Sequence, residues 1–442
     1  MMYVKTVSIW LWSALALVLS GIAQAGLPIQ HWQSANGARV YFVESRGLPL
    51  LDVSVDFDAG TRRDSAEKSG LANLTSHMLN LGAGGLSEEE ISRRLADVGA
   101  QLGATIDPDR AGMSLRTLSS TRERSQALDL MAKILQQPDF PATVLQREKA
   151  RVIAALQEED TQPGPIGQKA FQAAIYGSHP YALPGAGKVE TVARLQRQDL
   201  LDFFRQHYVS ESAVISIVGD VSREEAAGIA EQLSAGLPHA NGGLPPLPEV
   251  APLLQAETIL LPHPASQSHI LLGMPGISRN DVDYFPLYVG NYILGGGGFA
   301  SRLTEAVREK RGLAYSVYSY FMPLAQPGPF QIGLQTKRDQ ANEALEITLA
   351  TLRRFVADGP TAEELRHAKQ NLIGSFPLRL DSNRKILGYL SLIGYYNLPL
   401  DYLDQFVKNV DKVTLAQVKS AFQRHVNPEK MVTVIVGGDD KK

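Results

Sequence analysis

Two early stretches of the chain, 38–44 and 51–57, alternate hydrophobic with polar residues, and this period of two predicts half-buried strands. Residues 213–218 and 431–436 are continuous apolar runs that end at glycine, and they also predict strands. A further strand is expected at 113–118. The strand segments are separated by long stretches in which the hydrophobic period is that of a helix.

One of these helical stretches is central to the chemistry, and it runs from Gly70 to Gly85. Apolar residues recur there at spacings of three and four, at Leu71, Leu74, Met78 and Leu81. This pattern predicts a buried helix that Gly82 ends in the C-cap role. Further helices are expected after a capping box at Ser87 and Glu90, and over 124–160 with an interruption near 138–141.

The chain contains an internal repeat. A predicted helix followed by an apolar run occurs at 199–218 and again at 418–436. Four residues match at one offset of 218: Phe204 with Phe422, His207 with His425, Val218 with Val436, and Gly219 with Gly437. The matches indicate a duplicated domain, and convergent helix-then-strand composition is the alternative.

A proline-rich segment separates the two copies. We place a linker at 237–254, an N-terminal domain at 26–236 and a C-terminal domain at 255–442. The order of strands and helices favours an α+β fold made of two homologous sandwich domains. Each would be a mainly antiparallel sheet with helices packed on one face, and the two would face each other across a chamber.

Composition narrows the class of protein. The chain has 442 residues, 44% of them hydrophobic, a net charge of −3 and no cysteine. Disulfides and thiolate chemistry are therefore excluded, and no charge pattern favours nucleic acid. Residues 1–25 combine Lys5, an apolar run and Ala23-Gln24-Ala25, which predicts a cleavable secretory signal and a periplasmic protein with no later membrane span; an uncleaved anchor is the alternative.

The helix at 70–85 carries three polar residues on one face. Asn73, Ser76 and His77 stand at i, i+3 and i+4. Zinc catalysis needs about three protein ligands and an open position for water. Asn73 is a poor zinc ligand and Ser76 is no carboxylate base, so we expect His77 to be a satisfied core histidine.

A second distinctive segment runs from Leu294 to Tyr320. It begins with four glycines and continues as R-E-K-R-G-L-A-Y-S-V. The glycines would let the backbone approach something closely or flex, or they simply break a helix. They do not match a dinucleotide fingerprint, because the βαβ context is missing.

The duplication, the helix G-L-A-x-x-x-x-H-M and R-E-K-R-G-L-A-Y-S-V together resemble the insulinase (pitrilysin) family of zinc metallopeptidases. The chain looks closest to the short two-domain branch, which includes the mitochondrial processing peptidase and paired bacterial periplasmic proteins. In active members, H-x-x-E-H supplies two zinc ligands and a general base, and a glutamate 77 residues beyond the second histidine completes the site.

The resemblance implies a dismantled zinc site in this chain. The motif falls on Asn73, Ser76 and His77, and the distant ligand falls on Ala154. The nearby Glu158 and Glu159 lie about one helical turn, or about 5 Å, away from that position. No cofactor is therefore expected here, and zinc would be bound by the partner subunit.

The resemblance also implies that a second part of the active site is retained. The family's second half supplies an arginine and, seven residues later, a tyrosine that contact the substrate backbone and the developing oxyanion. These fall on Arg308 and Tyr315, with Gly312 expected to end the helix between them. The alternative is a surface ion pair for Arg308 and packing in a strand for Tyr315.

These observations favour a zinc-less, non-catalytic subunit of a heterodimeric peptidase. A homologous H-x-x-E-H partner would cleave an extended peptide, and this chain would close the chamber and donate Arg308 and Tyr315. The alternative is a structural or peptide-binding scaffold with no role in proteolysis. The substrate and the partner are not identifiable from the residues.

Overall fold

The computed structural model describes residues 27–240, 242 and 245–437, so the predicted signal segment 1–25 lies outside the described residues. The first half forms a six-stranded sheet in the order β1-β2-β8-β3-β7-β6. Its strands are β1 (Gln30–Gln33), β2 (Arg39–Glu44), β3 (Leu50–Phe57), β6 (Gln101–Ile106), β7 (Ala111–Leu118) and β8 (Val214–Gly219). A short hairpin, β4 (Gly82–Ala83) with β5 (Leu86–Ser87), stands apart from it.

The second half forms a five-stranded sheet in the order β11-β12-β10-β13-β9. Its strands are β9 (Glu257–Leu261), β10 (Gln267–Pro275), β11 (Ala314–Phe321), β12 (Pro329–Lys337) and β13 (Val432–Val436).

The two sheets repeat one topology. β8 pairs in parallel with β2 and antiparallel with β3, and the antiparallel order then continues through β7 to β6. β13 likewise pairs in parallel with β9 and antiparallel with β10, and the order continues through β12 to β11. The equivalent strands β8 and β13 are those related by the offset of 218. The shared order supports duplication of one α+β unit.

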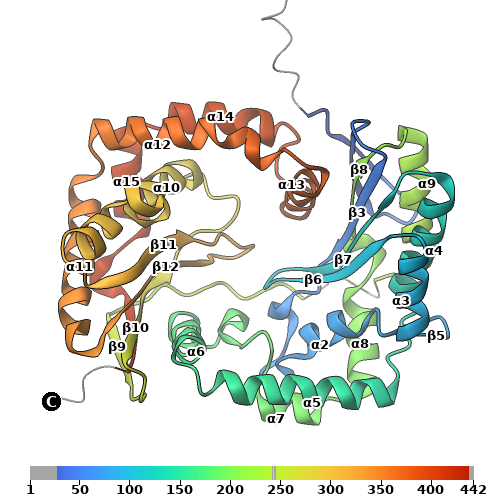
Figure 1. Cartoon of the computed structure of the whole chain (residues 1–442), viewed down its shortest axis with the longest axis horizontal. Helices are drawn as coiled ribbons and strands as arrows, with labels where there is room; N and C mark the ends of the chain where they lie inside the picture. The colour runs from blue at the N-terminus through green and yellow to red at the C-terminus, as the bar shows by residue number, and fades with distance from the viewer. Residues whose placement is uncertain (1–26, 241, 243–244, 438–442) are drawn as a thin grey trace, which may run out of the picture.

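Helices surround both sheets (Figure 1). The first half supplies α2 (Leu71–Met78), α3 (Glu88–Asp97), α4 (Thr121–Gln136), α5 (Ala142–Glu159), α6 (Pro163–Tyr176), α7 (Val189–Arg194), α8 (Arg197–His207) and α9 (Arg223–Ser234). The second half supplies α10 (Tyr284–Asn291), α11 (Ala341–Asp358), α12 (Ala362–Gly374), α13 (Asn383–Tyr396), α14 (Tyr402–Lys412) and α15 (Leu415–His425). Within the described residues, no helix is long and apolar enough to cross a bilayer.

The halves exchange one helix each. Helix α13 of the second half packs on β8 and β3, and α6 of the first half packs on β10 and β13 (Figure 1). Glycines allow both contacts, because an added Cβ at Gly394 would lie 2.5 Å from Val214, and one at Gly167 would lie 3.1 Å from Val436. Each sheet is therefore covered on its second face by the other half.

This exchange corrects the expectation of half-buried strands. Every residue of β3 after Leu50 is buried, including the alternating Asp52, Ser54 and Asp56. The polar side chains of β3 face the second side of the sheet, where the Ser391 hydroxyl of α13 donates to Asp56 at 2.7 Å. The alternation of apolar and polar residues in β3 therefore separates an apolar face from a polar face, and both faces of the strand are covered.

A buried carboxylate also joins the halves. Asp109 is fully buried and accepts hydrogen bonds from Arg62 (2.7 Å) and Tyr181 (2.5 Å) of the first half. It also accepts from the Tyr396 hydroxyl (2.6 Å) and the Ala325 N–H (2.7 Å) of the second half. Four donors from separate segments compensate the cost of burying this charge and fix the orientation of the halves.

Candidate functional site

Helix α2 begins at a strained but well-satisfied turn. Its N-cap Gly70 has φ 95°, and a side chain there would meet the backbone of Ala186. The Asp64 carboxylate accepts hydrogen bonds from the N–H groups of Gly70 (2.7 Å) and Ala72 (2.8 Å). The helix ends at Met78, earlier than the sequence suggested, and Gly82 lies in the hairpin strand β4 with φ 158°. The predicted C-cap role of Gly82 is therefore wrong.

The three polar residues of α2 differ in environment. Ser76 is buried, and its hydroxyl lies 3.4 Å from the Thr105 carbonyl oxygen of β6, while Asn73 is half-buried. The prediction that His77 is a core histidine is wrong, because its side chain is 47% exposed. The His77 side chain projects from α2 away from the core, and it pairs with a residue of α5.

That partner is Glu148, which the sequence did not single out. Its carboxylate is only 1% exposed and lies 2.9 Å from His77 Nε2. Arg147 donates to it at 2.7 Å and Arg151 at 3.0 Å. Burial acts to raise the pKa of Glu148, but the hydrogen bonds from His77 and Arg147, with the Arg151 charge, outweigh burial and lower it. The carboxylate is thus saturated by donors of this chain.

The distant ligand position offers no oxygen. Ala154 is exposed on α5, and it stands six residues beyond Glu148, about 120° away around the helix. Seven residues from Glu148 is Ala155, on the same helical face and also exposed. Either alanine leaves His77 as the single zinc-ligating side chain among the four motif positions. The residues present do not fit a catalytic zinc ion.

A different cluster has metal-ligand geometry within the described part of the chain. Ligand atoms of Asp281, Asp283 and His425 lie within 4.8 Å of one another. The Asp283 carboxylate is already engaged, because Arg424 donates to both of its oxygens at 2.6 and 2.8 Å and His425 Nε2 lies at 2.9 Å. This arrangement is an ion-pair network that ties α15 to the start of α10.

The structure brings Arg308 and Tyr315 together. The Arg308 guanidinium carbon lies 5.2 Å from the Tyr315 ring centroid and 4.7 Å from that of Phe299. Both rings are exposed, Tyr315 at 82% and Phe299 at 71%. Residues Phe299, Arg308 and Tyr315 are called the arginine cluster below. The rings hold the guanidinium by cation–π contact and leave its N–H edge available.

The donors of the arginine cluster make no hydrogen bonds among the described residues. Among the described residues, the ion partner of Arg308 is the exposed Glu309, 3.5 Å away, and no hydrogen bond engages the guanidinium or the Tyr315 hydroxyl. Gly312, with φ 63°, donates to the Arg308 carbonyl at 2.8 Å and ends the helical segment, as expected. Sequence reasoning missed Phe299, and its signal was an aromatic residue directly after four glycines.

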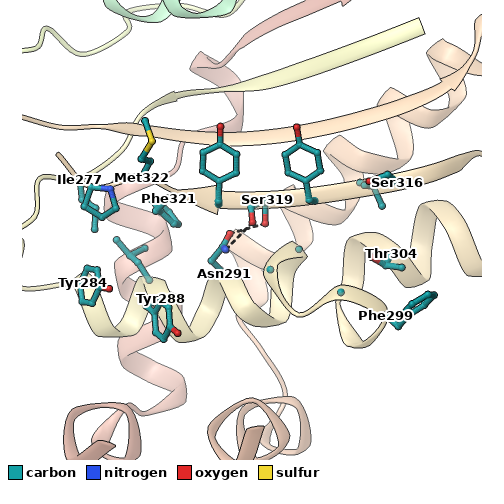
Figure 2. Close-up of a pocket in the computed structure, with 18 of the residues that line it drawn as sticks. Ile277, Tyr284, Tyr288, Asn291, Phe299, Thr304, Ser316, Ser319, Phe321 and Met322 are labelled. Carbon is teal, nitrogen blue, oxygen red and sulfur yellow. Dashed lines mark hydrogen bonds between the residues drawn. The ribbon is translucent and has the colours of Figure 1, made fainter. Parts of the chain in front are cut away.

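A cavity of about 710 Å³ adjoins the arginine cluster (Figure 2). It lies between β11 and the segment that runs from α10 through the π-helical turn Tyr292–Gly296 to the second π-helical turn Thr304–Glu309. Gly295 allows this packing, because an added Cβ would lie 2.6 Å from the Ser319 nitrogen of β11. The glycine run thus serves close approach, one of the two expected roles.

A neighbouring side chain contacts the edge strand of each sheet at one residue, as Ser76 does at Thr105 of β6. At β11, Asn291 donates to the Ser319 carbonyl at 3.0 Å and accepts from its hydroxyl at 2.7 Å (Figure 2). The equivalent edge strand β6 pairs with β7 alone, and an added Cβ at Gly103 would have no atom within 4 Å. Strand β6 therefore borders open space, where a further strand could pair.

Comparison with known proteins is consistent with this architecture. A model of the insulinase family (peptidase family M16) matches residues 42–188, and one of the peptidase M16 inactive domain matches residues 194–372. A crystal structure described as a peptidase M16 inactive domain from Pseudomonas fluorescens is 38% identical, with a TM-score of 0.90 over 94% of this chain and 99% of that one. The chain belongs to the M16 family. The inactive-domain model matches the second half of the chain, whereas the positions of the lost zinc ligands lie in the part that the insulinase model matches.

Two M16 relatives cover nearly the whole chain. An uncharacterized zinc protease, YmxG of Bacillus subtilis, is 27% identical over 88% of this chain and 94% of its own length. A protein of Helicobacter pylori named as a non-peptidase homolog is 24% identical over 96% of this chain and 97% of its own. Proteins named as peptidases and as non-peptidases therefore both resemble this chain.

Proposed function

We propose that this M16 chain is the zinc-less subunit of a heterodimeric peptidase and donates Arg308 and Tyr315 to a site whose metal is bound by a homologous H-x-x-E-H partner. The observation that carries the proposal is the contrast between the two remnants of the site. The Glu148 carboxylate beside His77 is saturated within this chain, whereas the half-buried Arg308 guanidinium and the hydroxyl of the exposed Tyr315 make no hydrogen bond among the described residues.

The arginine cluster has the chemistry that peptide hydrolysis requires of a second subunit. Attack on a peptide carbonyl places negative charge on its oxygen, and donors held in advance stabilise that charge. Arg308 supplies a fixed positive charge and a planar donor fork, and Tyr315 supplies a neutral hydroxyl. The flanking rings hold the guanidinium without consuming its N–H groups.

The peptide would bind in an extended form. Strand β6 offers an unpaired edge beside α2, and extended peptides commonly bind by adding a strand to such an edge. The predicted signal at 1–25 supports a periplasmic location for the complex.

A non-proteolytic scaffold is the second candidate. The H. pylori relative named as a non-peptidase homolog favours it, because that protein covers nearly the whole length of this chain. In that case the β6 edge would bind peptides without cleavage.

Co-expression distinguishes the two functions. The chain would be purified with and without an H-x-x-E-H homologue encoded in the same genome, and cleavage of quenched fluorescent peptides would be measured. We expect a stable pair whose activity exceeds that of either chain alone. Failure to co-purify, or a partner equally active without this chain, would overturn the peptidase proposal and leave the scaffold.

A further inference from the structure

The cavity beside the arginine cluster has an unusual charge balance. Its lining includes the aromatic residues Tyr284, Phe299, Tyr320 and Phe321, and its charged side chains are two arginines, Arg279 and Arg308, with no carboxylate. A volume of about 710 Å³ lies within the range of ligand-binding sites and exceeds the need of an ordered water cluster. Apolar walls with only positive charge favour bulky uncharged or acidic groups and disfavour basic ones.

Two features of the lining are a buried donor without a hydrogen-bond partner and an aromatic ring that is largely exposed. Arg279 Nε is buried and has no hydrogen-bond partner among the described residues, although the same guanidinium donates to the Pro323 carbonyl at 2.8 Å. Phe299 is 71% exposed on the turn Gly298–Ala300 at the cavity rim (Figure 2). A buried unpaired donor is costly, and a ligand that accepts from it would remove that cost. The same ligand would cover part of the exposed ring.

The position of the cavity identifies the ligand as part of a peptide. Arg308 lines the cavity and also belongs to the arginine cluster, so a chain segment that meets this guanidinium can place a neighbouring side chain in the cavity. At Ser319 the Asn291 side chain occupies the edge of β11, so a peptide cannot pair with the sheet at that residue. Recognition at this position therefore depends on the side chain.

We infer that this cavity is a side-chain subsite that accepts a large apolar residue of the peptide, with Phe299 as the residue that determines specificity. A carboxylate near this residue in the peptide adds affinity through the two arginines, and lysine or arginine in the cavity is rejected. The inference rests on the proposed function only in taking an extended peptide as the ligand.

Peptide binding by the purified chain tests the inference without any need for cleavage. Fluorescein-labelled ten-residue peptides of one background sequence would carry Phe, Leu, Ala or Lys at a single central position, and Kd would be measured by fluorescence anisotropy. We expect the Phe peptide to bind at least about tenfold more tightly than the Lys peptide, because burying a large apolar side chain is worth that much.

Matched variants assign the preference to the cavity. Phe299→Ala should reduce the Phe-over-Ala preference to about twofold, and Phe299→Glu should bring the Lys peptide to within about twofold of the Phe peptide. Leu260 is 66% exposed in β9, at the opposite edge of the same sheet, so Leu260→Ala and Leu260→Glu serve as controls that leave both preferences unchanged. Both positions are exposed, and their substitution leaves the fold intact.

Cross-linking locates the bound side chain independently. A peptide with p-benzoylphenylalanine at the central position should label the segment 277–323. Equal binding of the Phe and Lys peptides, no binding at millimolar concentration, or labelling confined to the first half would overturn the inference. Discrimination without cleavage in the presence of the partner would retain the subsite and reject the peptidase function.

Discussion

Helix α2 and the arginine cluster are the two regions that the family resemblance connects with an active site, and they differ in how their polar groups are paired. On α2, His77 is tied to the Glu148 carboxylate, which two arginines of α5 also engage. In the arginine cluster, two aromatic rings contact the half-buried guanidinium, and neither the guanidinium nor the Tyr315 hydroxyl makes a hydrogen bond among the described residues. Buried polar groups are nearly always hydrogen-bonded, whereas donors without a partner remain available for a ligand. The contrast supports the proposal that the second half keeps a role in peptide hydrolysis.

The largest expected effect is the return of a metal to α2. The variant Asn73→His, Ser76→Glu, Ala155→Glu supplies two histidines and a carboxylate, and Glu148 would then hold His77 as an outer-shell carboxylate. We expect close to one zinc per chain by plasma mass spectrometry after dialysis. The matched variant with Ala154→Glu in place of Ala155→Glu should retain far less zinc. If it retained more zinc than the Ala155→Glu variant, the helical spacing from Glu148 would be the wrong guide to the position of the third ligand.

Loss of the arginine cluster should be the next largest effect. In the active pair, Arg308→Ala with Tyr315→Ala should lower kcat/KM by about 10²- to 10³-fold, the usual result of removing oxyanion donors. His77→Ala should change kcat/KM by less than about twofold, because its partner is a structural carboxylate. An equal loss in both variants would remove the contrast between the remnants.

The structural role of Glu148 predicts an effect on stability. Glu148→Gln weakens three contacts with cationic or imidazole groups, so the free energy of unfolding should fall by about 1–3 kcal/mol in urea at pH 7. Glu88, a 45% exposed partner of Arg147, provides the control, and Glu88→Gln should cost less than about 0.5 kcal/mol. Similar losses in the two variants would mean that the buried carboxylate adds nothing beyond surface pairing.

A further effect, on the pH dependence of stability, concerns Asp64, which holds the start of α2. Burial raises the pKa of Asp64 to about 7, although the N–H groups of Gly70 and Ala72 act to lower it. The folded pKa therefore lies above the unfolded value of about 3.9, and the folded state retains the proton between these values. Stability relative to Asp64→Asn, which cannot titrate, should fall as pH rises from about 4 to 7. Urea unfolding across this range measures the difference, and a pH-independent difference would exclude the raised pKa.

Local sequence patterns predicted much of the fold. The offset of 218 pointed to the two sheets with one strand order, and the capping box at Ser87 marks the start of α3. The spacing of Arg308 and Tyr315 could not establish their proximity, because Gly312 breaks the helix between them. The structure supplies that contact through the ring of Tyr315 at the start of β11.

What the sequence missed depends on long-range contacts. The exposure of His77 follows from where α5 crosses α2, and no local pattern encodes that crossing. Glu148 did carry a signal, since it occupies a core position of α5 between the buried Leu145 and Leu156. The full burial of β3 follows from α13, which comes more than 300 residues later.

The exchange of α6 and α13 has a consequence for the order of synthesis. Strand β8 is the last strand of the first sheet along the chain, and it ends at Gly219. The helix that covers the second face of this sheet begins only at Asn383, 164 residues later. A nascent chain therefore carries a finished sheet with one uncovered face until most of the second half has emerged. Contacts of such sequence separation slow folding and expose apolar surface to aggregation. This architecture makes the protein depend on late-arriving residues, and a chain cut between its halves would leave each sheet without its cover.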